Sequence, residues 1–512
     1  MRLPFVPAVG TKARTRLVHL GAALLGGALS LIFPEAGLWW WAYVGLVPIL
    51  VLVVRAPARR EAGWRAWWAA FGFYLGLHHW LLPTLGPLAL PIAAALGVLW
   101  LPFGLAAWSL LRRPSWAGLG AALVVLPAVW VVVEQLRSWE AFAGSWGLLG
   151  LSQWQVPAVL SVAALGGVWL VSWMLVTVNV AVAAAVGPGR SGVQRTMAGG
   201  VAVVLVAAAA LYGSTRPDPP VDRILRIGGV QPGAIDGPGE RLVANEDLTR
   251  DLADHDVDLV VWGQSSVGFD PEVDAEVADR LTAVAKGIGV DVLVNVDARG
   301  TEDRIQKSAR LITAEGQGEP VYDKQRLVPF GEYIPGRAVL GWIGDVTEAA
   351  SEDRLPGDEL VLIDTAGVSV GPLISYESTF PDLRRAVSRL GAELVVVQGA
   401  STTFQGSWAL PQQASFEAVR AVESGRPAVL VQVSGTSSAF DPRGRQLVWV
   451  DQDEQRAFVV DVPVGQEETF YVRHGDWVLQ TSWLVVIVAG GWWATDAVRR
   501  RLQGGAGRSA GP

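Results

Sequence analysis

The chain has 512 residues, of which 51% are hydrophobic and 17% are charged, and it contains 24 tryptophans. A composition this apolar and this rich in tryptophan is typical of membrane proteins. The formal net charge of −7 argues against a nucleic-acid partner. The absence of cysteine excludes disulfides and thiolate metal sites, and the five histidines lack metal-ligand spacing. We therefore expect neither a metal nor another cofactor.

Residues 1–216 are predicted to form a bundle of seven membrane-spanning helices. Each apolar run in this segment is near the roughly 20 residues that cross a bilayer. The runs lie at 17–33, 38–54, 66–82, 88–111, 117–136, 157–186 and 198–213. An eighth transmembrane helix is predicted at 476–498, around the apolar run 482–494, and a tail at 499–512 follows it. The run itself is short, so its span depends on including Trp477 to Gln480.

Basic residues predict the orientation of the bundle, because loops rich in lysine and arginine stay in the cytoplasm. Alternate connections carry these residues, and the intervening ones are almost free of them apart from Arg137. The positions are Lys12, Arg14, Arg16, Arg55, Arg59, Arg60, Arg65, Arg112, Arg113, Arg190, Arg195, Arg499, Arg500 and Arg501. The pattern predicts that both termini are cytoplasmic and that the segment 217–475 is extracytoplasmic.

The segment 217–475 is predicted to be a soluble α/β domain. Strand-like apolar runs lie at 224–231, 258–263, 290–296, 308–314, 368–374, 393–399 and 428–435. Helical patterns at 240–255, 272–287 and 410–425 alternate with several of them. Near-continuous apolar strands between helices indicate sheets that are buried on both faces. The proline-rich linker TRPDPP at 215–220 marks the boundary with the bundle.

One stretch, GPLISYESTFPDL at 371–383, places a small hydroxyl side chain at a strand-to-helix turn. The strand-like run stops at Ser375, and an amphipathic helical pattern follows Pro381. Backbone N–H groups at such a turn can face an oxyanion. A serine at a strand end is usually an ordinary turn residue. Two further segments that follow strand-like runs, VVWGQSS at 260–266 and YDKQRLVPFGEYIP at 322–335, favour a functional site here.

The ordered motifs of the chain resemble those of the apolipoprotein N-acyltransferase family, membrane enzymes that carry a nitrilase-superfamily domain. The resemblance covers nearly the whole chain, and YDKQRLVPFGEY is its most specific motif. The motifs that carry it are FPEAGLWWWAYVGLVP (33–48), VWVVVEQLR (129–137), GLLGLSQ (147–153), YDKQRLVPFGEYIP (322–335), LPG (355–357), SYESTFPDL (375–383) and RAVESGRP (420–427).

The resemblance implies a fold, a reaction and a location. The fold is a multi-span α-helical bundle plus an extracytoplasmic nitrilase-like (carbon-nitrogen hydrolase) domain, an αββα sandwich of two sheets flanked by helices. The reaction moves an acyl chain from a membrane phospholipid to the amino group of the N-terminal cysteine of a diacylated lipoprotein. The location is the bacterial cytoplasmic membrane, where we expect the chain to be a monomer.

The implied chemistry uses a cysteine nucleophile, a glutamate base and a lysine that stabilises the oxyanion. The lysine position is Lys324, one of only four lysines in the chain. The nucleophile position holds Ser375 and the base position holds Gln264, so both depart from the family. A serine hydroxyl is far less ionised than a thiol, and a glutamine amide cannot accept a proton. The two changes predict that acyl transfer is impaired or lost.

Three explanations of the two departures are open. The chain could be deliberately inactivated, since Cys→Ser and Glu→Gln are nearly isosteric changes. It could be a natural paralogue that has lost acyl transfer and kept lipid or lipoprotein binding. It could also be an active variant in which Lys324 serves as the base for Ser375, with Glu332 or Glu377 as the carboxylate.

Other residues are expected to support the site. The resemblance implies that Glu332, in PFGEY, orients Lys324 as a second carboxylate. Glu377 is a further candidate for contact with that lysine, and the N–H of Tyr376 is a candidate oxyanion donor. Two candidate binding residues for an acyl groove, equally well explained as core, are Trp262 and Phe330.

Three further features are expected near the membrane surface. The loop GASTTFQG (399–406) and the pair Gln412–Gln413 stand where the family often has Asn-Asp and Gln-His pairs, and both should border the site. Glu134, in the fifth predicted span, is expected to form a structural pair with Arg137.

Functions of other classes are also compatible with parts of the sequence. A membrane-anchored nitrilase-like amidase would share the Glu-Lys-Cys chemistry and fail at the same two positions. The predicted spans favour a lipid substrate, because a soluble substrate does not require them. A binding protein without catalysis fits every motif, whereas a transporter leaves the α/β motifs without a role.

Overall fold

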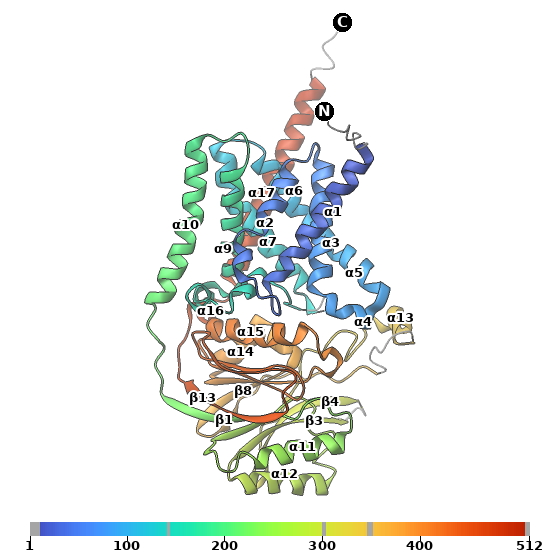
Figure 1. Ribbon diagram of the computed structural model, residues 1–512, viewed down its shortest axis with the longest axis vertical. Helices are drawn as coiled ribbons and strands as arrows, with labels where there is room; N and C mark the ends of the chain where they lie inside the picture. The colour runs from blue at the N-terminus through green and yellow to red at the C-terminus, as the bar shows by residue number, and fades with distance from the viewer. Residues whose placement is uncertain (1–10, 141–143, 300–303, 346–351, 507–512) are drawn as a thin grey trace, which may run out of the picture.

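The computed structural model describes residues 11–140, 144–299, 304–345 and 352–506. A bundle of long helices carries an α/β domain at one of its ends (Figure 1). Helix α1 (Thr11–Leu29) begins, and helix α17 (Trp477–Ala506) ends, at the opposite end of the bundle. The first and last helices therefore leave the bundle on the side away from the domain.

Among the described residues, six helices are long and apolar enough to cross a membrane. These candidate spans are Lys12–Ile32, His79–Leu111, Trp116–Arg137, Ala163–Val186, Gly192–Thr215 and Trp477–Asp496. They correspond to α1, α5 (Ala89–Gly97) with α6 (Leu101–Leu111), α7 (Trp116–Arg137), α9 (Ala163–Val186), α10 (Gly192–Thr215) and α17. The eighth predicted helix does include Trp477, as its short apolar run required.

The other two predicted spans correspond to helices of a different kind. The run 38–54 contains only the short helix α2 (Leu46–Val54) after a 3₁₀ turn. The run 66–82 belongs to α3 (Arg59–Leu77), whose first turn carries charged side chains. A total of eight spans therefore stays a prediction.

The α/β domain contains two stacked sheets. The first has the strand order β13-β1-β2-β3-β4-β5, with β6 paired to β4, and the second has the order β12-β11-β10-β9-β8-β7. The first sheet is built from β1 (Arg223–Gln231), β2 (Leu259–Trp262), β3 (Asp291–Arg299), β4 (Ile305–Thr313), β5 (Gly316–Gln317), β6 (Tyr322–Asp323) and β13 (Arg456–Val464). The second is built from β7 (Ile363–Thr365), β8 (Val368–Ile374), β9 (Leu394–Gly399), β10 (Ala428–Gln432), β11 (Ser437–Phe440) and β12 (Gln446–Val450).

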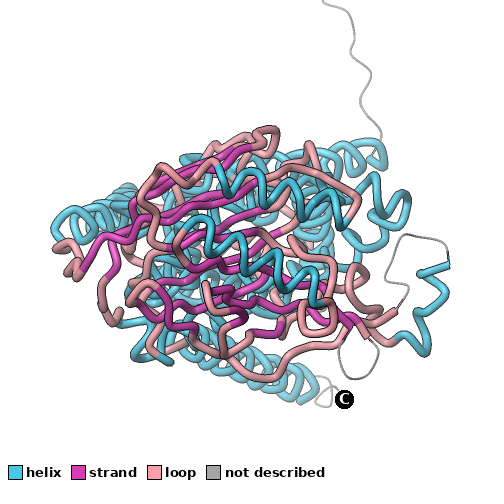
Figure 2. Tube along the Cα trace, turned by 90° about the horizontal axis from the view of Figure 1, so that it is seen from below, coloured by secondary structure: helices cyan, strands magenta, loops and turns pink. Residues whose placement is uncertain are grey.

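Helices cover the outer face of each sheet, which confirms the predicted αββα sandwich. Helices α11 (Pro238–Arg250) and α12 (Ala275–Ile288) lie across the first sheet, on the side away from the bundle (Figures 1 and 2). Helices α14 (Pro381–Leu390) and α15 (Ala409–Ser424) lie between the second sheet and the bundle (Figure 1). Parallel pairs β1–β2, β2–β3, β8–β9 and β9–β10 form the centre of the sheets.

Alternation of side chains divides the apolar residues of each strand between two cores. In β2, Leu259 and Val261 face the second sheet, whereas Val260 and Trp262 belong to the core under α11 and α12. All sixteen residues of α15 are buried, because one face packs on the second sheet and the other packs on the membrane bundle. The domain and the bundle therefore share this helix.

The predicted strands and helices of the domain are all present within a few residues of their expected ends. The helix ends follow ordinary rules. Asp274 caps the start of α12, where its carboxylate accepts from the N–H of Val277, and Gly289, with a φ of 79°, caps its end. The strands β5, β6, β7, β11, β12 and β13 were not predicted. They pair antiparallel with their neighbours at or beside the sheet edges.

Candidate active site

The candidate site lies where strands of both sheets end. Gln264 follows β2, and its backbone N–H donates to the carbonyl of Gly399 over 3.0 Å. Ile374 of β8 pairs with Gln398 of β9, so Ser375 lies beside Gly399 on the neighbouring strand. Parallel strands bring their carboxyl ends to one edge. The base and nucleophile positions therefore both lie near Gly399, where β9 ends.

The two sheets approach closely at this edge. A Cβ atom on Gly263 would lie 2.3 Å from the backbone N of Val433 and 2.9 Å from the carbonyl O of Gly399. No side chain fits there, so glycine is required immediately before Gln264.

Lys324 is fully buried and is held by a carboxylate. Its Nζ donates to Oε1 and Oε2 of Glu332 over 2.9 and 2.8 Å. Oε2 also accepts from the backbone N–H of Val328, which fixes the loop between the two residues. Burial by itself raises the pKa of Glu332. The positive charges of Lys324 and Lys307 and the hydrogen bonds to the carboxylate together lower it by more, so its pKa lies below the usual range. The Glu332 carboxylate therefore fixes the position of the Lys324 ammonium.

A second buried lysine, which the sequence analysis did not assign to the site, lies next to the first. Nζ of Lys307 donates to both oxygens of Asp297, over 2.9 and 2.8 Å, and to Oγ of Ser265 over 2.6 Å. The backbone N–H of Lys324 donates to the carbonyl of Lys307 over 2.8 Å. Burial is the main cause of a lowered pKa at Lys307. The chain has only four lysines, and this rarity was the one sequence feature that pointed to Lys307.

Glu377 joins the lysine loop to the serine turn. Its side chain is fully buried and accepts four hydrogen bonds of 2.7 to 3.0 Å. The donors are the hydroxyl of Tyr322 and the backbone N–H groups of Gln325, Arg326 and Ile374. Burial raises its pKa, and these hydrogen bonds oppose that rise. Glu377 thus fixes the two segments against each other.

Ser375 and Gln264, the two residues that differ from the family pattern, lie in unusual environments. Ser375 is buried and has a φ of 51°, a left-handed conformation that costs a non-glycine residue energy. Gln264 is also buried, and its Oε1 has no hydrogen-bond partner among the described residues. Ser265 next to it has a φ of 58°. Strained backbone and an unpaired polar atom collect at functional sites.

The remaining predicted residues are placed differently. Of the two alternatives for Trp262, an acyl groove or the core, the structure favours the core: its ring lies beneath α11, and its Nε1 donates to Oγ1 of Thr249 over 2.8 Å. Its even position in β2 turns it away from the second sheet. Phe330 is half-buried with a φ of 63° in the loop after Lys324. The hydroxyl of Tyr376 donates to the carbonyl of Glu140, so its side chain reaches the bundle.

Polar side chains also tie the domain to the bundle near the site. Gln412 of α15 accepts from Nε1 of Trp146 and donates to the carbonyl of Pro34, each over 2.7 Å. Ser401, in the loop 399–406, donates to Oε1 of Gln413 over 3.3 Å. The loop 399–406 and the pair Gln412–Gln413, both of which differ from the family pattern, therefore contact each other, and Gln412 contacts the bundle directly.

Glu134 and Arg137, expected to pair, are both buried and bind groups around them. Glu134 accepts from Nε1 of Trp130 over 2.9 Å and from the backbone N–H of Leu149 over 2.6 Å. Arg137 donates to the carbonyl of Trp146. The two side chains thus hold the segment that connects α7 to the rest of the bundle.

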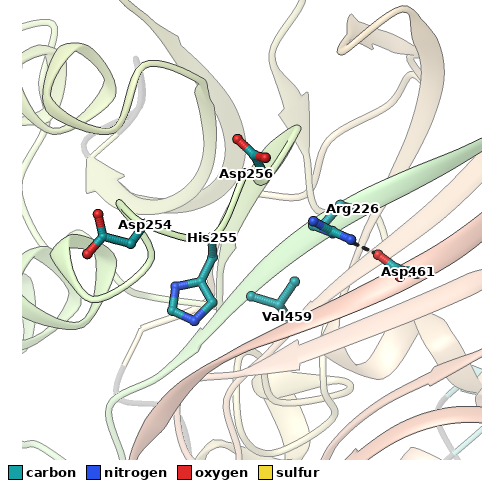
Figure 3. Close-up of a pocket in the computed structure, with 6 residues that line it drawn as sticks. All are labelled: Arg226, Asp254, His255, Asp256, Val459 and Asp461. Carbon is teal, nitrogen blue, oxygen red and sulfur yellow. Dashed lines mark hydrogen bonds and ion pairs between the residues drawn. The ribbon is translucent and has the colours of Figure 1, made fainter.

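A polar hollow of about 370 Å³ lies at the other end of the strands (Figure 3). Arg226 and Asp461 form an exposed ion pair of 2.9 Å there. The hollow is lined by Arg226, Asp254, His255, Asp256, Val459 and Asp461. Arg226 and Asp258 precede the parallel pairing of β1 and β2, whereas the candidate site follows it. The hollow is therefore separate from the site.

Sequence comparison finds relatives over almost the whole chain. A model of the apolipoprotein N-acyltransferase N-terminal domain matches residues 25–181, and a model of carbon-nitrogen hydrolases matches residues 236–470. An apolipoprotein N-acyltransferase of Gloeobacter violaceus is 30% identical over 500 residues, 92% of this chain and 93% of the relative. One from Pseudomonas aeruginosa is 28% identical over 485 residues, 89% of this chain and 92% of the relative.

Structure comparison finds amidases of the nitrilase superfamily. An amidase from Nesterenkonia AN1 is 23% identical, covers 51% of this chain and 99% of its own, and has a TM-score of 0.37.

Proposed function

Because the chain belongs to the apolipoprotein N-acyltransferase family, we propose that it binds a membrane phospholipid as acyl donor and a diacylated lipoprotein as acceptor, and that it transfers the acyl chain very slowly or not at all. The family acts on lipoproteins. One observation carries the proposal: the buried pair of Lys324 and Glu332 is intact, while Gln264 and Ser375 occupy the positions that move protons.

The proposed site contains the parts needed for charge stabilisation. In an acyl transfer of this type, the nucleophile attacks the ester carbonyl, its proton passes to the base, and the lysine stabilises the oxyanion. The lysophospholipid leaves with that proton. The amine then attacks the acyl-enzyme and gives a proton to the base, and the bond to the nucleophile breaks as the amide forms, so that the nucleophile recovers its proton from the base. Lys324 is fixed for its role by Glu332. We assign Tyr376 N–H as an oxyanion donor and Phe330 to the binding surface.

Proton transfer is the step that fails. For Ser375 to attack, its hydroxyl must lose a proton, and the amide of Gln264 has no atom that accepts one near neutral pH. Lys324 is a poor substitute, because its ammonium already donates to both oxygens of Glu332 and has no lone pair to offer. This contact argues against the serine–lysine explanation.

We also propose the orientation, the division and the assembly state of the chain. The bundle 1–216 and the helix 476–498 span the cytoplasmic membrane, with both termini and the tail 499–512 in the cytoplasm. The domain 217–475 is extracytoplasmic, and the chain acts as a monomer. The basic residues of alternate connections support this orientation. A reporter fused after Pro512 is expected to behave as cytoplasmic, and an extracytoplasmic reporter there would overturn the assignment.

Acyl transfer to a fluorescent diacylated peptide in detergent tests the function. Four proteins are compared: the chain itself, Gln264→Glu, Ser375→Cys and the double variant. Each single change is expected to recover little, because a thiol without a base and a base without a good nucleophile both stop the same step. The double variant should exceed the sum of the two by roughly 100-fold or more. Gln264→Glu with Ser378→Cys, a buried serine of the same turn, is the matched control.

The outcomes separate the explanations. Recovery only in the double variant supports an acyltransferase site that lacks its proton chemistry. Fast turnover by the unchanged chain that Lys324→Ala abolishes would refute the proposal and favour the serine–lysine explanation. Peptide binding without turnover in any of the four proteins would favour a binding protein. Hydrolysis of a soluble amide by the double variant, without acyl transfer, would favour the amidase.

A further inference from the structure

A second polar pocket lies where helix α10 meets the α/β domain. Its volume is about 270 Å³, just below the range of roughly 300–1,000 Å³ that is usual for small-molecule pockets. Its wall combines the end of a candidate membrane span with the turn between β11 and β12. The residues that matter are Gly213, Arg216, Asp218, Arg443 and Arg445.

The turn that carries Arg443 is held rigidly. The side chain of Asp441 accepts from the backbone N–H groups of Arg443 and Arg445, each over 2.8 Å. Gly444 has a φ of 75°, and a Cβ atom there would lie 2.9 Å from Cδ2 of Leu160 in the bundle. Because the turn is pressed against the bundle, Arg443 is presented in one fixed position.

Arg443 is a buried cation without a close carboxylate partner in the described chain. Its side chain is 6% exposed, and the nearest carboxylate is Asp218, at 3.6 Å from Nε and itself 62% exposed. Nη2 donates to the carbonyl of Gly213 over 2.6 Å and to that of Arg216 over 3.1 Å. Nη1 is buried and has no acceptor among the described residues. Burial and the charge of Arg216 lower the pKa of Arg443, which shows the cost of charging it there.

The other two arginines add to this positive charge. The side chain of Arg216 is 7% exposed; it pairs with Glu467 over 2.5 Å, yet its Nη1 also lacks an acceptor in the described chain. Arg445 is 54% exposed and pairs with Asp218 over 2.8 Å. Its Nη1 also lies 3.6 Å from Asp441. Three carboxylates, those of Asp218, Asp441 and Glu467, thus face the three arginines, and Oε2 of Glu467 is also buried without a partner in the described chain. The charges are equal in number, so the unusual feature of the pocket is that two guanidinium nitrogens have no acceptor.

Capping of α10 explains only part of this arrangement. An arginine that donates to the last carbonyls of a helix is favourable by itself. That accounts for Nη2 of Arg443 but not for the unpaired Nη1 atoms of two buried guanidinium groups. A group with several acceptor oxygens and a negative charge satisfies both.

We propose that this pocket binds a phosphate group, and that the phosphate is the headgroup phosphate of a membrane lipid. Arg443 and Arg216 would donate to its oxygens, with Arg445 at the rim. The position supports a lipid source, because Thr215 ends a candidate span and only 22% of that span is buried within the protein. A lipid lying along α10 would place its headgroup at this level of the bilayer. The site is distinct from the candidate active site, and the proposal does not depend on acyl transfer.

Native mass spectrometry of the full chain in detergent tests the site. The probes are phosphatidylglycerol and a diacylglycerol of the same acyl chains, which lacks the phosphate. Arg443→Gln is expected to lower retention of phosphatidylglycerol about tenfold or more, and to leave diacylglycerol unchanged. The control is Arg473→Gln, which removes an exposed arginine paired with Glu468 away from the pocket. Both variants keep the active site, so lipid bound there contributes equally to each. The difference in retention between Arg443→Gln and Arg473→Gln therefore reports on the pocket alone.

A second arm separates the two sources of phosphate. Inorganic phosphate, compared with chloride at equal ionic strength, is added during thermal unfolding of the same proteins. Stabilisation by inorganic phosphate that Arg443→Gln removes, with no preference for phosphatidylglycerol, would reject the lipid source. Equal lipid retention and equal phosphate response in both proteins would overturn the site. If Arg443→Gln does not fold, Arg445→Gln at the rim should lower retention about threefold, and no change there would overturn the site.

Discussion

The two halves of the candidate site differ in how completely their polar groups are satisfied. On the lysine side, Lys324 donates to both oxygens of the buried carboxylate of Glu332, and Lys307 donates to both oxygens of the half-buried carboxylate of Asp297. On the strand-end side, Gln264 has an unpartnered Oε1 among the described residues, and Ser375 has a strained backbone. Under the proposed function, the charged framework is kept although the proton chemistry is lost, because paired buried charges also hold the fold together.

The largest effect is expected on the lysine side. Lys324→Met leaves the buried carboxylate of Glu332 unpaired, which should cost about 3–5 kcal/mol of unfolding free energy. In the background with Gln264→Glu and Ser375→Cys it should also lower the rate of acyl transfer by roughly 100-fold. Thermal unfolding and the transfer assay measure the two effects. Lys286→Met, at an exposed position of α12, is the control, and equal losses in both variants would contradict the comparison.

The next effect concerns the carboxylate that joins the halves. Glu377→Gln replaces one acceptor oxygen by a donor while four donors face the side chain, so the free energy of unfolding should fall by about 2–4 kcal/mol. Thermal unfolding is the measurement. Ser378→Ala, in the same 3₁₀ turn, should change stability by less than about 1 kcal/mol, because its hydroxyl has no partner in the described chain. A loss as large as that of Glu377→Gln would show that the turn, and not the carboxylate, is being disturbed.

A smaller effect should appear in the pH dependence of stability. Glu332 has a pKa below its usual range in the folded chain, so its stabilising contribution is present above the unfolded pKa of about 4.3 and is lost as the pH falls through the folded value. Glu377, whose pKa is raised, contributes with the opposite sign. Melting temperatures between pH 7 and pH 3 should therefore fall less steeply for Glu332→Gln than for the unchanged chain. A steeper fall in that variant would mean that the sign is wrong.

The smallest effect is expected from relief of strain on the strand-end side. Ser375→Gly removes the cost of a φ of 51° and should stabilise the chain by about 1 kcal/mol. Ala366→Gly is a matched control, because Ala366 also has a φ of 51° but lies away from the site in the β7–β8 turn. Equal gains would mean that backbone strain is the only cost at Ser375. A larger gain at Ser375 would reveal a further cost of burying its hydroxyl.

The parts of the fold that were predicted are those specified locally. Apolar runs identified β2, β8 and β9, since each is buried on both faces. The strand β12 was missed because its burial is mixed and its pairing is antiparallel near an edge. The outcome for Trp262 could have been predicted, because alternation along β2 places it opposite Val261.

The site was predicted only as far as the family motifs reach. Gln264, Lys324 and Ser375 were identified from such motifs, whereas Lys307 lies outside them. Its contact with Ser265 joins residues 42 positions apart, one on β4 and the other in the turn after β2, and no local pattern specifies that contact. Contacts of this kind depend on the register of β3 and β4, which the sequence pattern alone leaves open.

Helix α15 also has a consequence for how the protein is assembled. It is buried on all sides, between a sheet synthesised just before and after it and a bundle whose helices α1 to α10 are synthesised first. An isolated domain would expose residues such as Phe416 and Val419, which pack in the bundle core. The inserted helices therefore serve as a template on which the last third of the domain matures. The folding of the domain is therefore coupled to that of the bundle, because α15 packs on both.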